Sequence, residues 1–172
     1  NQTPEQIAVL ISESKEEVYM PIPNAEEKEY YQMSSPQKRL YLIQQMQPES
    51  IAYNMPQNMR LNGEVKPDEV RNALQEMMNR HEILRTRFLM IDGEFMQQVL
   101  PYLDADFEYV SSTEPDEVLI GEYLRPFNLN EPPLVRMKLV NKGTYHLLLI
   151  DMHHIVSDGM SVNTFIREFT AL

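Results

Sequence analysis

Two adjacent histidines and a nearby carboxylate are the residues of this chain whose types and spacing could do chemistry. They form an HHxxxDG pattern, His153-His154-Ile155-Val156-Ser157-Asp158-Gly159. Histidine is the side chain that acts most often as a general base, because its reference pKa of about 6.5 lies close to physiological pH. The pattern therefore predicts a site of proton transfer, in which the carboxylate holds a loop or pairs with an arginine. Gly159 is expected where the backbone needs a positive φ or a close approach.

An apolar run, Leu147-Leu148-Leu149-Ile150, precedes the two histidines and predicts a buried strand. Side chains alternate across a strand, so His153 and His154 should face opposite ways. Only one of them can then enter a given site, and the other must pack or form hydrogen bonds within the fold. Both could instead be structural, and Asp158 could simply belong to a turn or cap a helix. These seven residues alone do not identify an enzyme.

The composition is typical of one ordinary globular domain with a sizeable core: 172 residues, 42% hydrophobic and 24% charged. The absence of cysteine excludes disulfides, a thiol nucleophile and Cys-based zinc sites, which suits a cytoplasmic protein. Residues 1–20 lack the apolar core of a signal peptide, and no apolar stretch approaches the ~18 residues that span a membrane. The net charge of −11 argues against nucleic acid as the main partner.

The chain also contains basic spots, most of which we interpret as ordinary solvated charges: Lys38-Arg39, Arg80, Arg85, Arg87, and Arg136 with Lys138. His146, the histidine pair and Asp158 could suggest zinc, but strand alternation separates the adjacent histidines, and no metal is expected. No P-loop, GxGxxG or GxSxG motif occurs, so nucleotide binding and a nucleophile-elbow hydrolase have no support.

The N-terminal third predicts a short helix, a linker and the start of a domain. A helix begins at Thr3-Pro4 and fades by Ser14, and residues 15–30 show no sustained apolar period. Residues 1–20 are therefore assigned to a preceding domain. Ser35-Pro36 begins a second helix that ends near Pro48, and residues 55–62 predict a strand.

The remaining segments predict helices and strands around one core. A helix begins at Pro67 and carries a stripe of core residues: Val70, Leu74, Met77 and Met78. Asp92-Gly93 predicts a hairpin of residues 84–91 and 95–100. A strand at 106–110, a helix at about 116–125, and a strand pair at 134–140 and 145–152 follow. The chain stops inside an apolar helix, so we expect a fragment of something longer; its stripe is Val162, Phe165, Ile166, Phe169 and Leu172.

Three separated segments together resemble the condensation domains of nonribosomal peptide synthetases. Residues 35–42, SPQKRLYL, resemble that family's SxAQxRLxxL motif, and residues 80–88, RHEILRTRF, resemble its RHExLRTxF motif. Residues 152–161, MHHIVSDGMS, are similar to its MHHxxxDGxS motif. The order and approximate spacing also match, over about residues 21–172. There are two small departures: Pro36 replaces the usual Ala, and Met160 stands where an aromatic residue is common.

The resemblance implies an α/β fold of the α+β two-layer kind, with a chloramphenicol-acetyltransferase-like mixed sheet and helices packed on one side. Family members have two lobes, and the catalytic motif lies at the end of the first. Residues 21–172 would therefore be the N-terminal lobe, with the C-terminal lobe absent. Residues 1–20 would be the end of an upstream carrier domain and its linker.

The resemblance also implies an activity and its partners. The amine of an acceptor aminoacyl thioester attacks a donor acyl or peptidyl thioester and forms an amide. Both substrates are delivered on phosphopantetheine by an upstream donor and a downstream acceptor carrier domain, so no cofactor is bound directly. No nucleic acid or membrane partner is expected, and the fragment alone should be inactive because the other lobe completes the substrate channel.

Within the family motifs the second histidine is the catalytic one, which assigns that role to His154. It could take a proton from the acceptor amine or stabilise the tetrahedral intermediate. Five other residues have supporting or structural roles. His153 is expected to pack within the fold, and Asp158 to pair with an arginine that can come from the second lobe. Gly159 is expected to meet a backbone requirement, and Arg80 and Arg85 to lie at the floor of the site. Ser157 resembles the subtype that takes an L-configured donor, and Arg87 is expected at the surface.

Two other interpretations remain open. A freestanding acyltransferase of the same superfamily could complete its site across a trimer interface, although the SPQKRL segment and residues 1–20 argue against it. A non-catalytic lobe could serve only as a docking surface. The mass in solution would separate a trimer from a monomeric lobe.

Overall fold

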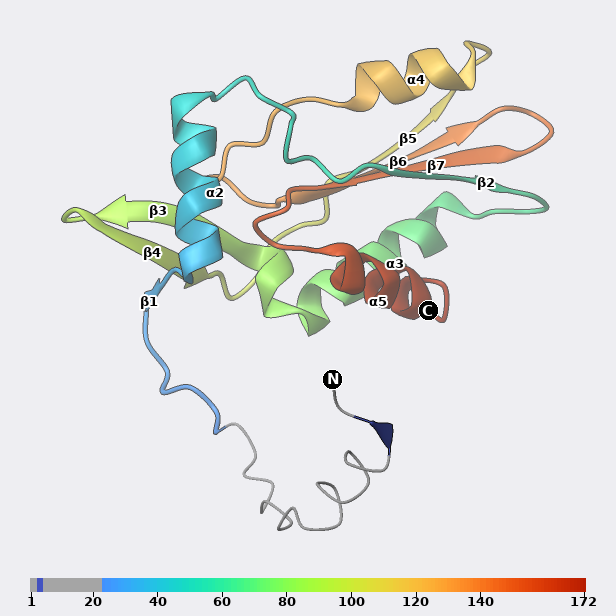
Figure 1. Cartoon of the computed structure of the whole chain (residues 1–172). Coiled ribbons are helices and arrows are strands. Elements are labelled where there is room, and N and C mark those ends of the chain that lie inside the picture. The colour runs from blue at the N-terminus through green and yellow to red at the C-terminus, as the bar shows by residue number, and fades with distance from the viewer. Residues whose placement is uncertain (1–2, 5–22) are drawn as a thin grey trace.

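The computed structural model describes residues 3–4 and 23–172 (Figure 1). The predicted carrier-domain end at residues 1–20, with its helix, lies outside the described residues apart from residues 3 and 4. Within the described ranges, no helix is both long enough and apolar enough to cross a bilayer.

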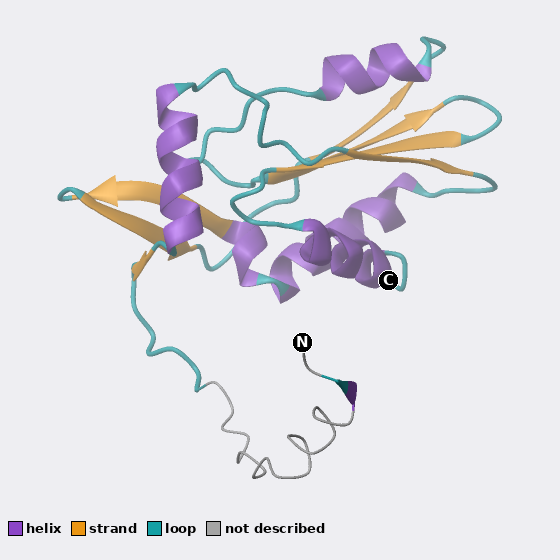
Figure 2. Cartoon of the chain, in the orientation of Figure 1, coloured by secondary structure: helices purple, strands orange, loops and turns teal. Residues whose placement is uncertain are grey.

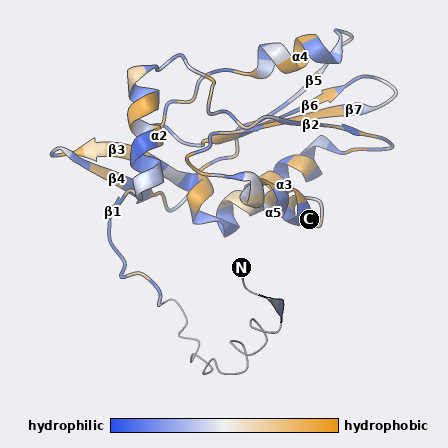
Figure 3. Ribbon diagram, in the orientation of Figure 1, coloured by the Kyte–Doolittle hydropathy of each residue, from blue (hydrophilic) through white to orange (hydrophobic). Residues whose placement is uncertain are grey.

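A four-stranded mixed sheet forms the centre of the molecule, in the order β2, β7, β6, β5 (Figures 1 and 2). Its strands are β2 (Gln57–Leu61), β5 (Phe107–Ser111), β6 (Val135–Asn141) and β7 (His146–Met152). β7 pairs antiparallel with β2 and β6, whereas β5 runs parallel to β6. The expected mixed sheet is therefore confirmed. The two central strands, β6 and β7, are apolar and buried on both faces, whereas the outer strands β2 and β5 are partly exposed (Figure 3).

Helices cover both faces of this sheet. α3 (Pro67–Arg80) and α5 (Gly159–Phe169) pack on one face, against the side chains of Leu148, Ile150 and Met152. The shorter α4 (Asp116–Tyr123) covers part of the other face. The expected layer of helices on one side thus corresponds to α3 and α5, and α4 is an addition to it.

The apolar stripes of the two longer helices supply much of the core. Leu74, Met77 and Met78 of α3 are buried, which confirms that these methionines fill the core. From α5, Phe165 and Phe169 are buried and stack with ring centroids 5.9 Å apart. Burying each large apolar side chain contributes roughly 1.5–3 kcal/mol, so these stripes account for why the helices dock here. The last residue of the predicted stripe, Leu172, instead lies beyond the end of α5 and is exposed.

A second, three-stranded antiparallel sheet lies beside the first, in the order β1, β4, β3. Its strands are β1 (Tyr31–Gln32), β3 (Thr86–Ile91) and β4 (Glu94–Val99). The hairpin predicted at Asp92-Gly93 is confirmed, with positive φ at both turn residues. A short 3-10 helix, η1 (Glu82–Arg85), occupies the start of the predicted first strand. That strand therefore begins at Thr86 instead of Leu84.

α2 (Ser35–Met46) lies across the junction of the two sheets (Figure 1). Ser34 and Gln37 form a capping box at its N-terminus, which fixes where the helix begins. Apolar residues beneath the helix form a second core cluster that includes Tyr41, Phe88, Ile155 and Val156. This packing brings the first and third of the motif segments together.

Candidate active site

The two histidines leave the carboxyl end of β7 with opposite exposure. Along β7, Leu147 and Leu149 pack towards α4, while the alternate residues Leu148, Ile150 and Met152 pack towards α3 and α5. The alternation continues past the end of the strand, so His153 is fully buried and His154 is exposed. The predicted opposite orientation of the pair is confirmed.

His153 is buried in the core, and both of its ring nitrogens have hydrogen-bond partners. Its Nδ1 accepts a hydrogen bond from the Ile155 backbone N–H at 3.0 Å, and its Nε2 lies 3.4 Å from Oε1 of Gln44. These partners assign the neutral tautomer with the proton on Nε2. Burial, with a smaller effect of the neighbouring His154, lowers the pKa of His153 to about 4. His153 therefore stays uncharged near neutral pH and holds the turn that follows it.

His154 faces a cleft of about 390 Å³. Its backbone N–H donates to the carbonyl oxygen of Tyr53 at 2.8 Å, which fixes the position of its Cα. The cleft lies between the N-terminus of α2 and the motif loop, and its lining includes Ser34, Gln37, Leu40, Ile83, Ser157 and Asp158. An exposed imidazole on a recess of this size can meet a substrate, whereas the buried neighbour cannot.

Asp158 caps the last helix. It is the N-cap residue of α5, and its Oδ1 accepts from the backbone N–H of Ser161 at 2.7 Å and from that residue's hydroxyl at 2.6 Å. These hydrogen bonds lower the pKa of the Asp158 carboxyl, so it is ionised at neutral pH. Of the two expectations for this carboxylate, helix capping is what the structure shows. Within residues 23–172 no arginine forms an ion pair with it.

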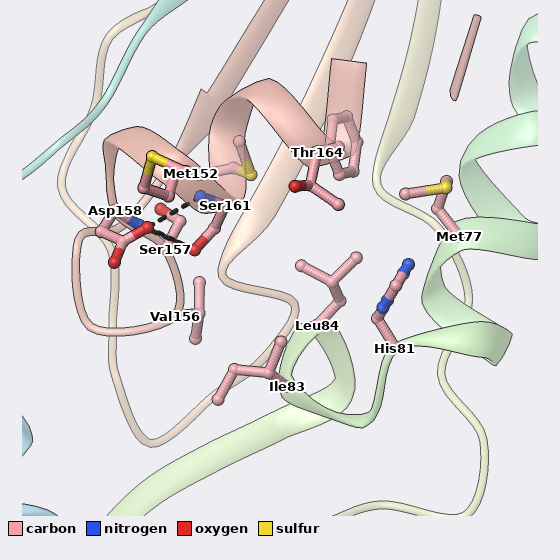
Figure 4. A pocket seen from close by; sticks show the side chains of 12 residues that line it. Met77, His81, Ile83, Leu84, Met152, Val156, Ser157, Asp158, Ser161 and Thr164 are labelled. Atoms are coloured by element: carbon pink, nitrogen blue, oxygen red, sulfur yellow. Dashed lines mark hydrogen bonds between the residues drawn. The ribbon is translucent and has the colours of Figure 1, made fainter. Parts of the chain in front are cut away.

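A second recess, of about 430 Å³, shares part of its lining with the first (Figure 4). Met77 and His81 line it from the end of α3, and Thr164 lines it from α5. The motif loop forms the wall between the two recesses, because both are lined by the same five residues: Ile83, Val156, Ser157, Asp158 and Ser161.

The two motif arginines bind other parts of the fold and do not line the His154 cleft. Arg80 is at the end of α3 and contacts Glu168 of α5 at 3.4 Å, where Glu168 also lies 2.8 Å from His81. Arg85 donates to the carbonyl oxygen of Leu100 at 2.8 Å. Neither arginine lines either recess, so in the described part of the chain both join elements of the fold and neither forms a site floor.

Gly159 shows no special backbone requirement. It is the first residue of α5, its φ is not positive, and a Cβ built on it would meet no atom within 4 Å. The expectation of a positive φ or a close approach is therefore wrong for the described chain. The turn is made instead by the extended backbone of Asp158, whose cap lets the helix begin directly at the glycine.

Sequence reasoning missed the buried network next to the histidines. Arg136 and Asp151 form an ion pair at 2.6 Å with side chains only 3% and 0% exposed. Arg136 is therefore not a solvated charge, and its guanidinium also lies 4.0 Å above the ring of Phe127. The sequence did contain a signal for this pair. One strand of the predicted hairpin carries Arg136 and the other carries Asp151, each inside an apolar run, and the register places the two residues opposite each other.

Two further polar residues join this region to distant parts of the chain. Asn54 donates from Nδ2 to Oδ2 of Asp151 at 2.7 Å and to the carbonyl oxygen of Arg125 at 3.0 Å. Gln44 of α2 reaches His153 and is itself buried. No sequence periodicity marks either residue. In the part of the chain that the structure describes, no cluster of three or more His, Asp or Glu residues has the arrangement of a metal site.

Comparison with known sequences identifies a family. Residues 27–172 match the family described as "Condensation domain". Bacitracin synthase 3 of Bacillus licheniformis is 40% identical over 168 residues, which cover 96% of this chain and 3% of that protein. Surfactin synthase subunit 2 of Bacillus subtilis (strain 168) is 43% identical over 164 residues, which cover 94% of this chain and 5% of that protein. The chain thus spans a small fraction of the length of these relatives.

Solved structures show the same fold. The starter condensation domain of rhizomide synthetase superposes with a TM-score of 0.73 at 22% identity, over 81% of this chain and 37% of that one. A four-domain nonribosomal peptide synthetase, holo-AB3403, superposes with a TM-score of 0.76 at 20% identity, over 83% of this chain and 11% of that one. The chloramphenicol-acetyltransferase-like fold expected from the motifs is therefore confirmed.

Proposed function

The chain belongs to the condensation-domain family of nonribosomal peptide synthetases, and from this we propose that it forms part of a domain that makes amide bonds. The acceptor amine nitrogen attacks the carbonyl carbon of the donor thioester. The carbon–sulfur bond then breaks, and the products are an amide and the free thiol of the donor carrier. The proton lost by the amine balances the proton gained by the thiolate, so no further reactant is needed.

We infer that His154 is the group that handles this proton. The observation that carries the inference is the opposite exposure of the two histidines, since only His154 faces the cleft. A neutral imidazole there can accept a proton from the attacking amine and return it to the leaving sulfur. General base catalysis of this kind contributes roughly 10²–10⁴-fold.

Positioning is expected to contribute at least as much as proton transfer. Amine attack on a thioester is intrinsically easy, and holding both reactants in place can supply about 7–11 kcal/mol of the barrier. The loss caused by His154→Ala should therefore vary with the substrates. We assign supporting roles to His153 and Asp158, which hold the motif loop, and to Arg80 and Arg85, which join the elements around it.

We propose that donor and acceptor carrier domains deliver the two thioesters on phosphopantetheine arms, and that a second lobe closes the cleft. The open cleft beside His154 and the match to 37% of the rhizomide starter domain support a partner lobe. Such a lobe could also supply an arginine for Asp158. The chain alone is then expected to be inactive.

The test is single-turnover amide formation between loaded donor and acceptor carriers, with this chain alone and with the protein extended through the second lobe. Each is measured with and without His154→Ala. Product only from the extended protein, reduced by the substitution, is the expected result. Unchanged rates with His154→Ala across several substrate pairs would overturn the assignment of His154.

The same proteins separate the competing functions. A trimer of the chain in solution, active with a free acyl thioester and a small acceptor, would favour the acyltransferase. An extended protein that binds carriers but forms no amide with any pair would favour a docking lobe. Comparing L- and D-configured donors tests the preference that Ser157 suggests.

A further inference from the structure

A closed ring of hydrogen bonds lies directly behind the two histidines. Two donors, Nδ2 of Asn54 and Nη2 of Arg136, each reach the same two acceptors, Oδ2 of Asp151 and the carbonyl oxygen of Arg125. The carboxylate accepts at 2.7 Å from the amide and at 2.6 Å from the guanidinium. We call Asn54, Arg136 and Asp151 the buried clamp.

The clamp ties the segment of Asn54 to the backbone that carries His154. On one side of Asn54, the Met55 N–H donates to the carbonyl oxygen of Met152 at 2.7 Å. On the other side, the carbonyl oxygen of Tyr53 accepts from the His154 N–H at 2.8 Å. These two hydrogen bonds flank a single bridge between Asn54 and His153, which lies just beyond the β2–β7 ladder that begins at Gln57. The side chain of Asn54 adds a buried polar contact to this short pairing at the end that carries His154.

Stability alone does not account for the clamp. Removing an ion pair from water is costly, and well-packed apolar residues of similar volume are often as stabilising or more so. Three buried atoms of the clamp, Oδ1 of Asn54, Nε of Arg136 and Oδ1 of Asp151, have no hydrogen-bond partner in the described chain. An arrangement with this cost is best explained by the fixed geometry that it imposes.

We propose that Asn54 is a positioning residue for the reaction: through the buried clamp and the Tyr53 carbonyl, it holds His154 against the cleft. This inference rests on the proposed function. A displacement of about 1 Å from productive geometry can cost on the order of 10²-fold in rate. Asn54 itself lies behind the loop and does not line the His154 cleft.

The test compares Asn54→Leu, Asn54→Ser and His154→Ala in the full-length synthetase, below the melting temperature of each. Asn54→Leu removes both donated hydrogen bonds at similar volume, and Asn54→Ser keeps a single hydroxyl donor. The matched control is Asp116→Asn, since Asp116 also accepts from an arginine but lies by the opposite end of β7. The readouts are kcat, KM for the loaded carriers, and hydrogen exchange of the His154 amide.

We expect Asn54→Leu to lower kcat by about 10- to 100-fold with little change in KM, and to speed exchange of the His154 amide but not of amides within β6 and β7. Asn54→Ser should give a smaller loss, and Asp116→Asn none. A folded Asn54→Ser or Asn54→Leu protein with unchanged kcat, or with slowed turnover but unchanged exchange at His154, overturns the positioning role. An unaffected His154→Ala protein would overturn the proposed function itself, which is a separate outcome.

Discussion

The two ends of β7 carry similar ionic groups in different surroundings. At the end near Tyr145, Asp116 accepts from Arg60 at 2.8 Å and from the Tyr145 hydroxyl at 2.8 Å; its carboxylate is buried, but the Arg60 side chain is 64% exposed. At the site end, Arg136 and Asp151 are almost fully removed from water. A pair with one exposed partner is partly screened by water, whereas a pair with both partners buried is costly to form and very costly to break.

This difference separates two uses of charge in one sheet. The contacts of Asp116 with Arg60 and Tyr145 join β2, α4 and the turn between β6 and β7. The buried clamp fixes the last residues before the histidine pair. The buried polar contacts of this sheet thus lie next to the histidine that we propose as the catalytic residue.

Breaking the buried pair should have the largest effect on stability. Arg136→Met leaves Asp151 without its cation, and we expect a loss of roughly 3–5 kcal/mol in the free energy of unfolding, measured by urea titration. The double substitution Arg136→Met/Asp151→Leu should recover most of this loss because no isolated charge remains. If the double variant is as unstable as the single one, the cost does not come from the buried charge.

Acid should reveal the burial of His153. Its folded-state pKa of about 4 lies below the ordinary 6.5, so the unfolded chain binds more protons between these values. The stability that this histidine contributes is complete above pH 6.5 and is lost as the pH falls towards 4, by about 3 kcal/mol in all.

The check is the difference between the pH–stability curves of the natural protein and of His153→Gln. The carboxylates whose pKa values are lowered, such as Asp158 and Glu168, are common to both proteins and cancel in that difference. Parallel curves between pH 6.5 and 4 would show that His153 is not held neutral by burial.

Asp158 should separate capping from catalysis. Asparagine is as good an N-cap as aspartate, so Asp158→Asn should leave the melting temperature nearly unchanged, whereas Asp158→Ala should lower it. If an arginine of a second lobe pairs with the carboxylate, Asp158→Asn should nonetheless reduce single-turnover rates by about tenfold or more. Equal rates in the Asn variant and the natural protein would leave Asp158 with its capping role alone.

The exposed end should respond least. Arg60→Gln is expected to change the melting temperature by less than any of the stability changes above, and added salt should shrink even that difference because the guanidinium is exposed. Thermal unfolding at low and high ionic strength measures both effects. A loss as large as that of Arg136→Met would remove the distinction between the two ends.

Much of the site could be predicted because it follows from local patterns. The run from Leu147 to Ile150 gives a strand, its alternation separates His153 from His154, and the three motif segments give the family. Patterns were less informative where contacts depend on distant segments. Arg136 belongs to a group of basic spots expected to be mostly solvated, yet packing buries it against Asp151, whose carboxylate also binds the distant Asn54.

The sequence by itself determined most of the elements, the stripes that dock them and the opposite orientation of the two histidines, because helical and strand periodicity are properties of neighbouring residues. Only the tertiary structure decided which charges are buried and which side chains hold the site. Asn54 meets Asp151 across 97 residues and Gln44 meets His153 across 109. Such contacts depend on how whole helices and strands pack together, so the spacing of residues along the chain does not predict them.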